Sequence, residues 1–328
     1  MINIKEFYAG RKIVVTGGAG FIGSFLIEAL VAVGARVSVL VKPSTDIWRL
    51  TGSVPNISIF PVDLNQIEAV KKFFADTRPS IVFNLAALVN TKQDPILLES
   101  ILRENFQNVF NLLRAAVDSN VDRFVQMGTN DEYGMQSAPF LETQHEMPIS
   151  PYALSKTLST HSLLFFHRSL GLDTRVVRPA AAYGPRQWFG MLIPNLIRAG
   201  IEKKDFPMNP GEQYRDFVYI EDLVDGILRI GAAEQGAGEI INFGSGRPRG
   251  YKIKDVALML NRLMGDPVKI TFGVNAYRAL DVMEAYADCQ KAQRLLGWKA
   301  TTDLETGLQK TIRWYKEHTD VFEKLAKH

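Results

Sequence analysis

The chain has 328 residues, a formal net charge of +3, one cysteine and five histidines. Its 46% hydrophobic and 22% charged residues are ordinary for a folded protein, which excludes disordered and fibrous classes, and its scattered basic residues argue against nucleic-acid binding. A charged N-terminus, no long apolar run and a lone Cys289 predict no signal peptide, membrane span or disulfide, so we expect a cytoplasmic protein.

Short apolar runs alternate with helix-period segments through the first 180 residues. The runs are rich in Val, Ile and Phe, and most lack polar alternation, which predicts strands buried on both faces. The predicted strands are 12–16, 35–41, 57–62, 80–85, 123–127 and 174–178. The predicted helices between them are 21–33, 66–76, 96–120 and 151–170. This order predicts right-handed crossovers and an α/β Rossmann-type fold, a doubly wound parallel sheet.

After Tyr183 the pattern changes, because turn-rich segments separate the helical ones. The helices predicted in this part are 191–199, 220–232, 253–263 and 304–316. We therefore expect a dinucleotide-binding domain over 1–180 and a smaller, irregular substrate lobe over 181–328, with some of its segments returning to the sheet. No flexible linker separates the two, so they should share an interface. Ligands should bind at the carboxyl ends of the strands.

A glycine-rich turn follows the first predicted strand directly. Gly17, Gly20 and Gly23 have the spacing GxxGxxG, and the next helix opens at Phe21 and Ile22. A turn without side chains lets a pyrophosphate approach backbone N–H groups at a helix N-terminus. The position between a strand and a helix predicts a dinucleotide site rather than a purely structural turn.

A second motif, YxxxK, lies at the start of the helix predicted over 151–170. Tyr152 and Lys156 are four residues apart, so they share one face of the helix. A neighbouring ammonium should lower the pKa of the phenol, which would let Tyr152 exchange a proton with a substrate hydroxyl or a ketone. The alternative interpretation is a surface Tyr–Lys pair.

Together, the GxxGxxG turn, the segment NLAA, the YxxxK helix and the block RDFVY resemble the extended branch of the short-chain dehydrogenase/reductase (SDR) family. The resemblance covers nearly the whole chain. It implies an NAD(P) cofactor, a nucleoside-diphosphate sugar as substrate, and a homodimer formed through the helices at 96–120 and 151–170.

The resemblance also implies further cofactor-binding residues. Asp63 and Leu64, after the third predicted strand, would face the adenine, and Leu85, Ala86 and Ala87 would lie against the cofactor. One position departs from the family pattern. Lys42 ends the second strand where an acidic residue usually holds the ribose of NAD, so NADP or dual use is favoured and NAD is not excluded. A solvated lysine is the alternative.

The third catalytic partner implied by the resemblance is Thr129, four residues before Tyr133 of the YG pair. Its hydroxyl could polarise a forming ketone. Asp131 then gives Thr-x-Asp, where sugar dehydratases have Thr-x-Glu, and a carboxyl group suits the proton transfers that dehydration needs. The alternative is a carboxylate that caps the loop.

Three arginines are expected to bind the substrate. Arg186 lies in the YGPR turn, Arg215 in the RDFVY block, and Arg278 in the segment AYR. Planar guanidinium groups suit a diphosphate, whereas the alternative for each is a surface ion pair. The histidines lack partners at metal-ligand spacing, so no metal is expected.

These residues predict hydride transfer at C4 of a nucleoside-diphosphate sugar by an NAD(P)-dependent epimerase or dehydratase. The close alternative is an NADPH-dependent reductase of 4-keto-6-deoxy sugars. A reductase of another ketone would not need Arg215 and Arg278, and a non-catalytic dinucleotide sensor would not need Tyr152.

Overall fold

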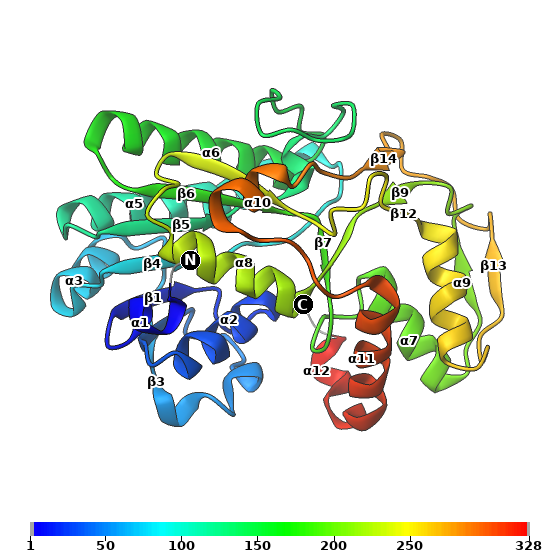
Figure 1. Cartoon of the computed structure of the whole chain (residues 1–328). Helices are drawn as coiled ribbons and strands as arrows, with labels where there is room; N and C mark the ends of the chain where they lie inside the picture. Colours follow the sequence, from blue (N-terminus) through cyan, green and yellow to red (C-terminus); the bar gives the residue numbers. More distant parts are fainter. Residues whose placement is uncertain (1–2, 327–328) are drawn as a thin grey trace.

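A seven-stranded, wholly parallel sheet forms the centre of the larger lobe (Figure 1). The computed structural model describes residues 3–326. The strand order is β11-β6-β5-β4-β1-β2-β3, which is the doubly wound order expected from the alternating apolar runs. The strands are β1 (Lys12–Thr16), β2 (Arg36–Val41), β3 (Ile57–Pro61), β4 (Ile81–Asn84), β5 (Arg123–Met127), β6 (Thr174–Pro179) and β11 (Glu239–Phe243).

The six strands predicted in the first 180 residues are confirmed to within one residue at each end. The seventh strand, β11, comes from the second half of the chain and pairs in parallel with β6. Its helix α8 (Ile220–Ala232) packs on α2 (Phe21–Ala32) of the first half. The division at residue 180 stays a prediction, because the larger lobe takes segments from both sides of it.

Helices cover both faces of the sheet (Figure 1). Contacts between helices group α1 (Ile4–Tyr8), α2 and α8 together, and α3 (Ile67–Thr77), α5 (Asn108–Asp118) and α6 (Pro151–Leu170) together. Helix α6 has the predicted bounds. The Ser150 hydroxyl accepts the Ala153 N–H at 3.1 Å, Pro151 occupies the first position, and Gly171 ends the helix at φ +73°.

The helix predicted over 96–120 is present as consecutive helical segments from Pro95 to Asp118, but its hydrogen-bonding pattern changes along the way. The segment is divided into η3 (Pro95–Leu97), α4 (Leu98–Ile101), a π-helical stretch (Leu102–Gln107) and α5. Asn105 in the π-helical stretch bonds both backbone groups of Leu88, at 2.7 and 3.1 Å, and donates to the Ser155 hydroxyl at 3.0 Å. The wider turn thus ties this helix to the loop after β4 and to α6.

The smaller lobe contains the predicted helices as α7 (Leu192–Glu202), α9 (Ile253–Leu263) and α11 (Leu304–Glu317). One hydrophobic cluster continues from Val15 in β1 through Ile227 in α8 to Ile197, Leu260 and Ile312 in those helices. The two lobes therefore share a core, as the lack of a linker predicts. The remaining strands are β7 (Ala181–Tyr183), β8 (Phe206–Met208), β9 (Tyr214–Arg215), β10 (Phe217–Tyr219), β12 (Tyr251–Lys252), β13 (Ile270–Phe272) and β14 (Glu284–Ala285). The remaining helices are η1 (Trp48–Leu50), η2 (Val54–Asn56), η5 (Asn130–Glu132), α10 (Gln290–Leu296), η6 (Thr319–Val321) and α12 (Phe322–Leu325).

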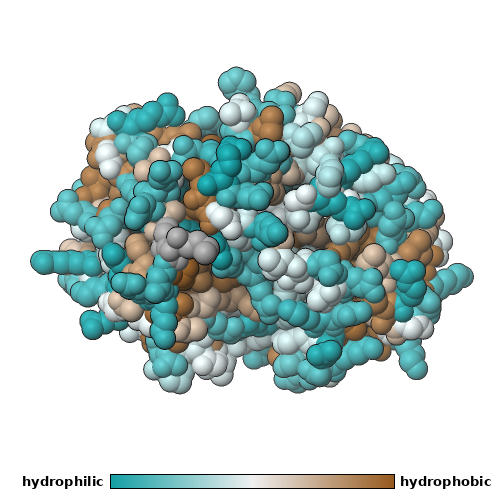
Figure 2. Space-filling model, viewed as in Figure 1, coloured by the Kyte–Doolittle hydropathy of each residue, from teal (hydrophilic) through white to brown (hydrophobic). Residues whose placement is uncertain are grey.

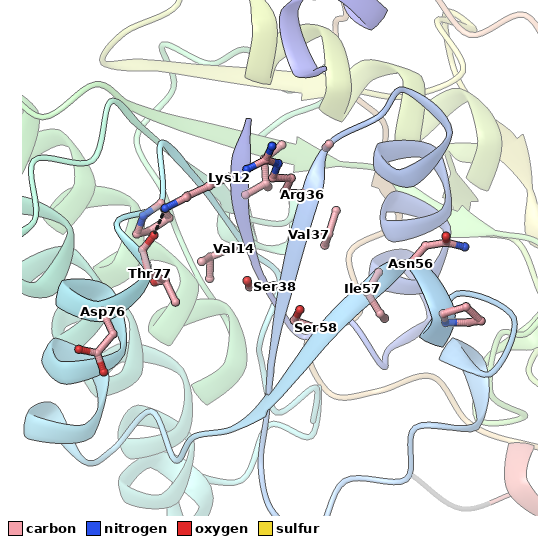
Figure 3. Close-up of a pocket in the computed structure, with 14 residues that line it drawn as sticks. Lys12, Val14, Arg36, Val37, Ser38, Asn56, Ile57, Ser58, Asp76 and Thr77 are labelled. Atoms are coloured by element: carbon pink, nitrogen blue, oxygen red, sulfur yellow. Dashed lines mark hydrogen bonds between the residues drawn. The ribbon is translucent and has the colours of Figure 1, made fainter. Parts of the chain in front are cut away.

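The surface is mostly hydrophilic on the face drawn in Figure 2, with smaller hydrophobic patches between the polar side chains. None of the described helices is long and apolar enough to cross a membrane. A hollow of about 530 Å³ opens at the amino ends of β1, β2 and β3, where Lys12, Arg36 and Asn56 line it (Figure 3). All of the predicted site residues are described, and none of them lines this hollow.

Candidate active site

The glycine turn after β1 leaves no room for a side chain at Gly17 or Gly23. Gly17 has φ +67°, and a Cβ on it would lie 2.5 Å from the carbonyl carbon of Leu85. A Cβ on Gly23 would lie 2.7 Å from Gly18 Cα and would overlap the Gly17 carbonyl oxygen. Gly20 is the N-cap of α2, whose first N–H groups have no partner within the helix. This cradle fits a dinucleotide pyrophosphate, because bare backbone N–H groups and a helix N-terminus meet there.

The exit from β4 lies against this turn. The N–H groups of Leu85 and Ala86 donate to the backbone oxygen and the hydroxyl of Thr16, at 3.1 and 3.2 Å. Leu85, Ala86 and Ala87 are all partly exposed. The structure therefore brings the predicted NLAA segment and the glycine turn together at the carboxyl ends of β1 and β4.

A row of polar side chains connects these strand ends to the predicted catalytic helix. Thr16 donates to Asn84, which donates to Gln126 at 2.7 Å, and Gln126 donates to the Met127 carbonyl at 2.9 Å. Lys156 Nζ donates to the same carbonyl at 2.8 Å. Lys156 is thus held at a fixed place across the carboxyl ends of three neighbouring strands.

Tyr152, Lys156 and Thr129 lie together at the end of β5. Lys156 Nζ is 5.9 Å from the centroid of the Tyr152 ring, and both side chains are almost completely buried. Thr129 is the N-cap of η5, where its hydroxyl accepts the Asp131 N–H at 3.2 Å, and its side chain acts on Tyr152 by lowering the pKa of the phenol. The spacing of the sequence motif therefore becomes the expected spatial cluster.

The lowering of the Tyr152 pKa by Lys156 together with a bound nicotinamide stays a prediction, and within the protein other groups dominate the pKa of Tyr152. Burial raises the pKa of Tyr152, the charges of Asp131 and Glu132 raise it further, and the bond with Thr129 lowers it. Burial also lowers the pKa of Lys156 to about 8, against the charge of Glu132. Burial dominates at both groups, because it penalises whichever form carries the charge.

Asp131 and two of the three predicted arginines share one region. Asp131 is exposed, yet the protein around it raises the pKa of its carboxyl through desolvation, against the opposing charges of Arg215 and Arg278. Arg215 pairs with Asp281 at 2.9 Å, and Arg278 donates to the Thr91 hydroxyl at 3.3 Å. The cations of the smaller lobe thus lie near the catalytic loop.

Arg186 is not part of that group. Its guanidinium forms a two-bond ion pair with Glu28 in α2, at 2.7 and 2.8 Å, and lies 3.8 Å from the ring centroid of Phe25. This pair joins the YGPR turn to the helix that follows the glycine turn. The geometry gives Arg186 a partner inside the protein.

Two predicted adenosine-side residues also have partners. Lys42 is exposed and forms an ion pair with Glu104 in the π-helical stretch. Asp63 accepts the Asn65 N–H at 3.0 Å, and Leu64 is buried with its carbonyl bound by Asn111 at 2.9 Å. The Lys42 ammonium, which the sequence analysis took as favouring NADP, is therefore paired with the carboxylate of Glu104.

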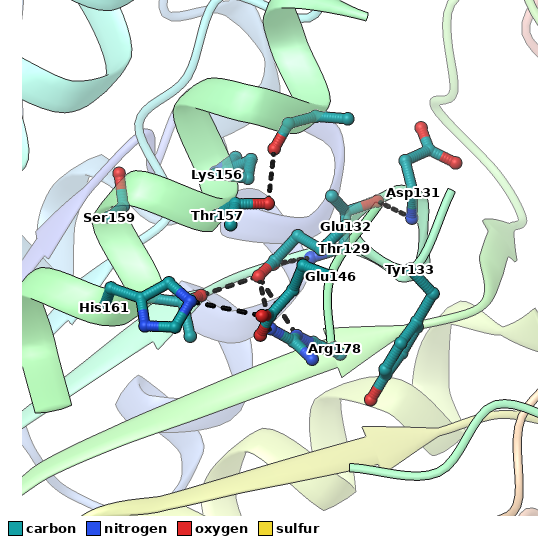
Figure 4. A network of polar contacts seen from close by, with 12 residues as sticks. Thr129, Asp131, Glu132, Tyr133, Glu146, Lys156, Thr157, Ser159, His161 and Arg178 are labelled. Atoms are coloured by element: carbon teal, nitrogen blue, oxygen red, sulfur yellow. Dashed lines mark hydrogen bonds and ion pairs between the residues drawn. The ribbon is translucent and has the colours of Figure 1, made fainter. Parts of the chain in front are cut away.

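A buried ionic network behind the catalytic residues was missed by the sequence analysis (Figure 4). Arg178 in β6 donates to Glu132 at 2.7 and 3.0 Å, and to Glu146 at 2.6 Å. Glu146 contacts His161 of α6 at 3.1 Å. A local signal was present, because Thr129 and Glu132 have the spacing of a capping box and form one.

Among residues 3–326, no group of three or more His, Cys, Asp or Glu side chains is placed to hold a metal ion.

Residues 13–244 match the model of the NAD-dependent epimerase/dehydratase family. The chain belongs to this family. Its members are extended SDR enzymes, so the resemblance inferred from the sequence is confirmed, as is the Rossmann-type fold. The family is NAD-dependent, and the matched range includes the glycine turn, Thr129, Tyr152, Lys156 and Arg215.

Two curated family members are similar to nearly the whole chain. A UDP-glucuronate 4-epimerase from Thermodesulfobacterium geofontis is 32% identical over 95% of this chain and 98% of its own. A dTDP-glucose 4,6-dehydratase from Neisseria meningitidis serogroup B is 30% identical over 94% of both chains. Neither relative is a ketoreductase, and the reductase alternative is not favoured.

Solved structures of family members agree. A UDP-glucose 4-epimerase from Thermotoga maritima with UDP-glucose superimposes with a TM-score of 0.86, at 29% identity over 94% of this chain and 99% of its own. A dTDP-glucose 4,6-dehydratase from Streptomyces venezuelae with NAD bound also gives 0.86, at 28% identity over 95% of this chain and 99% of its own. Both reactions of the family are thus represented among similar folds.

Proposed function

We propose that this protein acts on a nucleoside-diphosphate sugar by reversible hydride transfer at C4, with Tyr152 as the acid–base group. The observation that carries this proposal is the cluster of Tyr152, Lys156 and Thr129 at the carboxyl end of β5. The polar row from Thr16 connects that cluster to the glycine turn. Two solved structures with similar folds support the proposal. One is an epimerase with UDP-glucose, and the other is a dTDP-glucose 4,6-dehydratase with NAD bound.

Each member of the cluster has a distinct task. Tyr152 removes the proton from the C4 hydroxyl and returns it later. Lys156 stabilises the phenolate by its charge, and Thr129 donates a hydrogen bond to the reacting oxygen. NAD, when bound, supplies the hydride acceptor. Because burial raises the pKa of Tyr152, proton removal depends on positive charge brought close to the phenol.

The geometry favours epimerisation over dehydration. Dehydration needs a base for the C5 proton and an acid for the departing hydroxyl. Glu132 is held in the buried ion pair with Arg178, so it is not free to act as that base or acid. Asn130, in the same loop, carries an amide in place of an acidic group. Asp131 is a carboxyl group in the same loop whose pKa is raised by desolvation, which keeps dehydration as the second candidate.

The test is a panel of nucleotide sugars incubated with the protein and NAD, followed by mass spectrometry and sugar analysis. Epimerisation leaves the mass unchanged and inverts C4, whereas dehydration removes one water. Asp131→Asn should abolish a dehydration but leave an epimerisation near its normal rate. No product from any sugar in the panel would refute the proposal.

The cofactor is proposed to be NAD. The NADP preference expected from Lys42 stays a prediction, and the ion pair with Glu104 weakens its physical basis, because a carboxylate beside the lysine repels a 2′-phosphate. The NAD-bound fold of the Streptomyces venezuelae dehydratase also supports NAD.

The homodimer is proposed to form through α5 and α6. Phe165 of α6 is 59% exposed and Leu170, at the end of the same helix, is 54% exposed, and large exposed apolar side chains suit an interface. Phe165→Asp should shift the molecular mass in light scattering from two chains to one. A monomeric natural protein would refute this arrangement. The cytoplasmic location stays a prediction.

A further inference from the structure

Glu132 is the most enclosed acidic side chain of the catalytic region. It has no exposed surface, and neither does Arg178, its partner in β6. A buried ion pair is costly to desolvate and is maintained only when further hydrogen bonds satisfy it. Glu132 has such bonds, and they lead to the catalytic elements (Figure 4).

Its two carboxylate oxygens reach three separate segments. Oε1 accepts the Thr129 backbone N–H at 2.9 Å. Oε2 accepts the Thr160 hydroxyl of α6 at 2.7 Å, and Nη2 and Nε of Arg178 at 2.7 and 3.0 Å. One side chain thus joins the loop that carries Thr129, the helix that carries Tyr152 and Lys156, and strand β6.

Its charge also acts on the proton-transfer groups. Glu132 raises the pKa of Lys156 against burial, and it raises the pKa of Tyr152. Four other ionisable groups lie around Glu132. They are Arg178 of β6, Glu146 of the loop before α6, His161 of α6, which contacts Glu146, and Asp131 of η5. Of these, Asp131 also raises the pKa of Tyr152, whereas burial and Glu132 account for the shift of Lys156.

We propose that Glu132 is a positioning residue for the reaction: it fixes Thr129 against the catalytic helix, and it places a carboxylate on Thr160, one turn of α6 from Lys156. The proposal rests on the proposed function, because it needs a reaction in which Tyr152 and Lys156 take part. Glu132 does not reach the substrate itself, since its oxygens are occupied by Thr129, Thr160 and Arg178.

The two tasks can be separated by two substitutions. Glu132→Gln keeps the length and the oxygen that accepts from Thr129 but removes the charge. Both Lys156 and Tyr152 then lose a group that raises their pKa, so the bell-shaped pH profile of kcat should move toward acid by about one pH unit. Glu132→Asp keeps the charge but is one methylene shorter. It should lower kcat by about tenfold or more without moving the profile.

Glu146→Gln is the matched control. Glu146 also pairs with Arg178, at 2.6 Å, but it binds neither Thr129 nor Thr160. This variant should keep the natural kcat and pH profile even if its thermal stability falls. An equal acid shift in Glu146→Gln and Glu132→Gln would overturn the proposal, because the shift would then follow from general damage to the network.

Thr160→Val tests the anchoring if Glu132→Gln does not fold. It removes one bond to Glu132 and changes no charge, so kcat should fall several-fold at an unchanged pH profile and unchanged NAD affinity. Natural kcat in both Thr160→Val and Glu132→Asp would refute the positioning role. Loss of the proposed function has a different signature, since the natural enzyme would then turn over no sugar, or Tyr152→Phe would remain fully active.

Discussion

The glycine turn makes the most quantitative prediction, because the space at Gly23 is known to a fraction of an ångström. A Cβ there would lie 2.7 Å from Gly18 Cα and closer still to the Gly17 oxygen, whereas ordinary contacts begin at 3.4 Å. Gly23→Ala therefore has to push the start of α2 away from the turn by roughly 1 Å. An N–H···O bond stretched that far is lost.

We expect Gly23→Ala to weaken NAD binding by about 10- to 100-fold. One hydrogen bond to a charged group contributes about 1.5–3 kcal/mol, and each 1.4 kcal/mol is about tenfold in affinity. The dissociation constant measured by calorimetry checks this value, and a thermal melt checks that the variant is folded.

Gly52→Ala is the control in the same lobe. A Cβ on Gly52 meets no atom within 4 Å, and its φ is not in the left-handed region. Its NAD affinity should equal that of the natural protein. Equal affinity in a folded Gly23→Ala variant would refute the argument that this turn is the pyrophosphate cradle.

Three further predictions concern single groups. Tyr152→Phe should lower kcat by about 10²-fold or more at unchanged NAD affinity, and unchanged turnover would exclude Tyr152 as the acid–base group. Glu104→Gln should raise affinity for NADP relative to NAD, because it removes the carboxylate paired with Lys42; equal effects on the two cofactors in binding titrations would contradict this. Asp216 is buried and its pKa is raised by desolvation, so its ionisation destabilises the fold as the pH rises above the ordinary carboxyl range. Asp216→Asn should therefore gain thermal stability relative to the natural protein as the pH rises through and above the ordinary carboxyl range, and parallel melting curves across that rise would disprove it.

The parts of the fold that local chemistry controls could be predicted from the sequence. Helix α6 has a serine cap, a proline at its first position and a glycine after its last, so its bounds follow from neighbouring residues. The glycine turn was likewise predictable, because strand, turn and helix are consecutive in the chain. The meeting of Tyr152 with Thr129 followed from the resemblance to a known family.

Features that depend on distant residues could not be predicted. The partner of Arg186 is Glu28, which lies 158 positions away, and the partner of Arg178 is Glu132, 46 positions away. Nothing in the spacing of single charges shows such pairs. The π-helical stretch depends on Asn105 bonding Leu88 and Ser155, which again are brought close only by the folded sheet.

The return of α8 and β11 to the sheet limits how the specificity of this protein can be re-engineered. A fragment ending near residue 180 would lack β11 and would leave β6 as an unpaired edge strand. All six residues of β6 are buried in the intact protein, and an edge strand exposed in this way promotes aggregation. A chimera that exchanges the sugar-recognising part with a relative should therefore graft 181–219 and 244–328 as two inserts and retain 220–243 with the host.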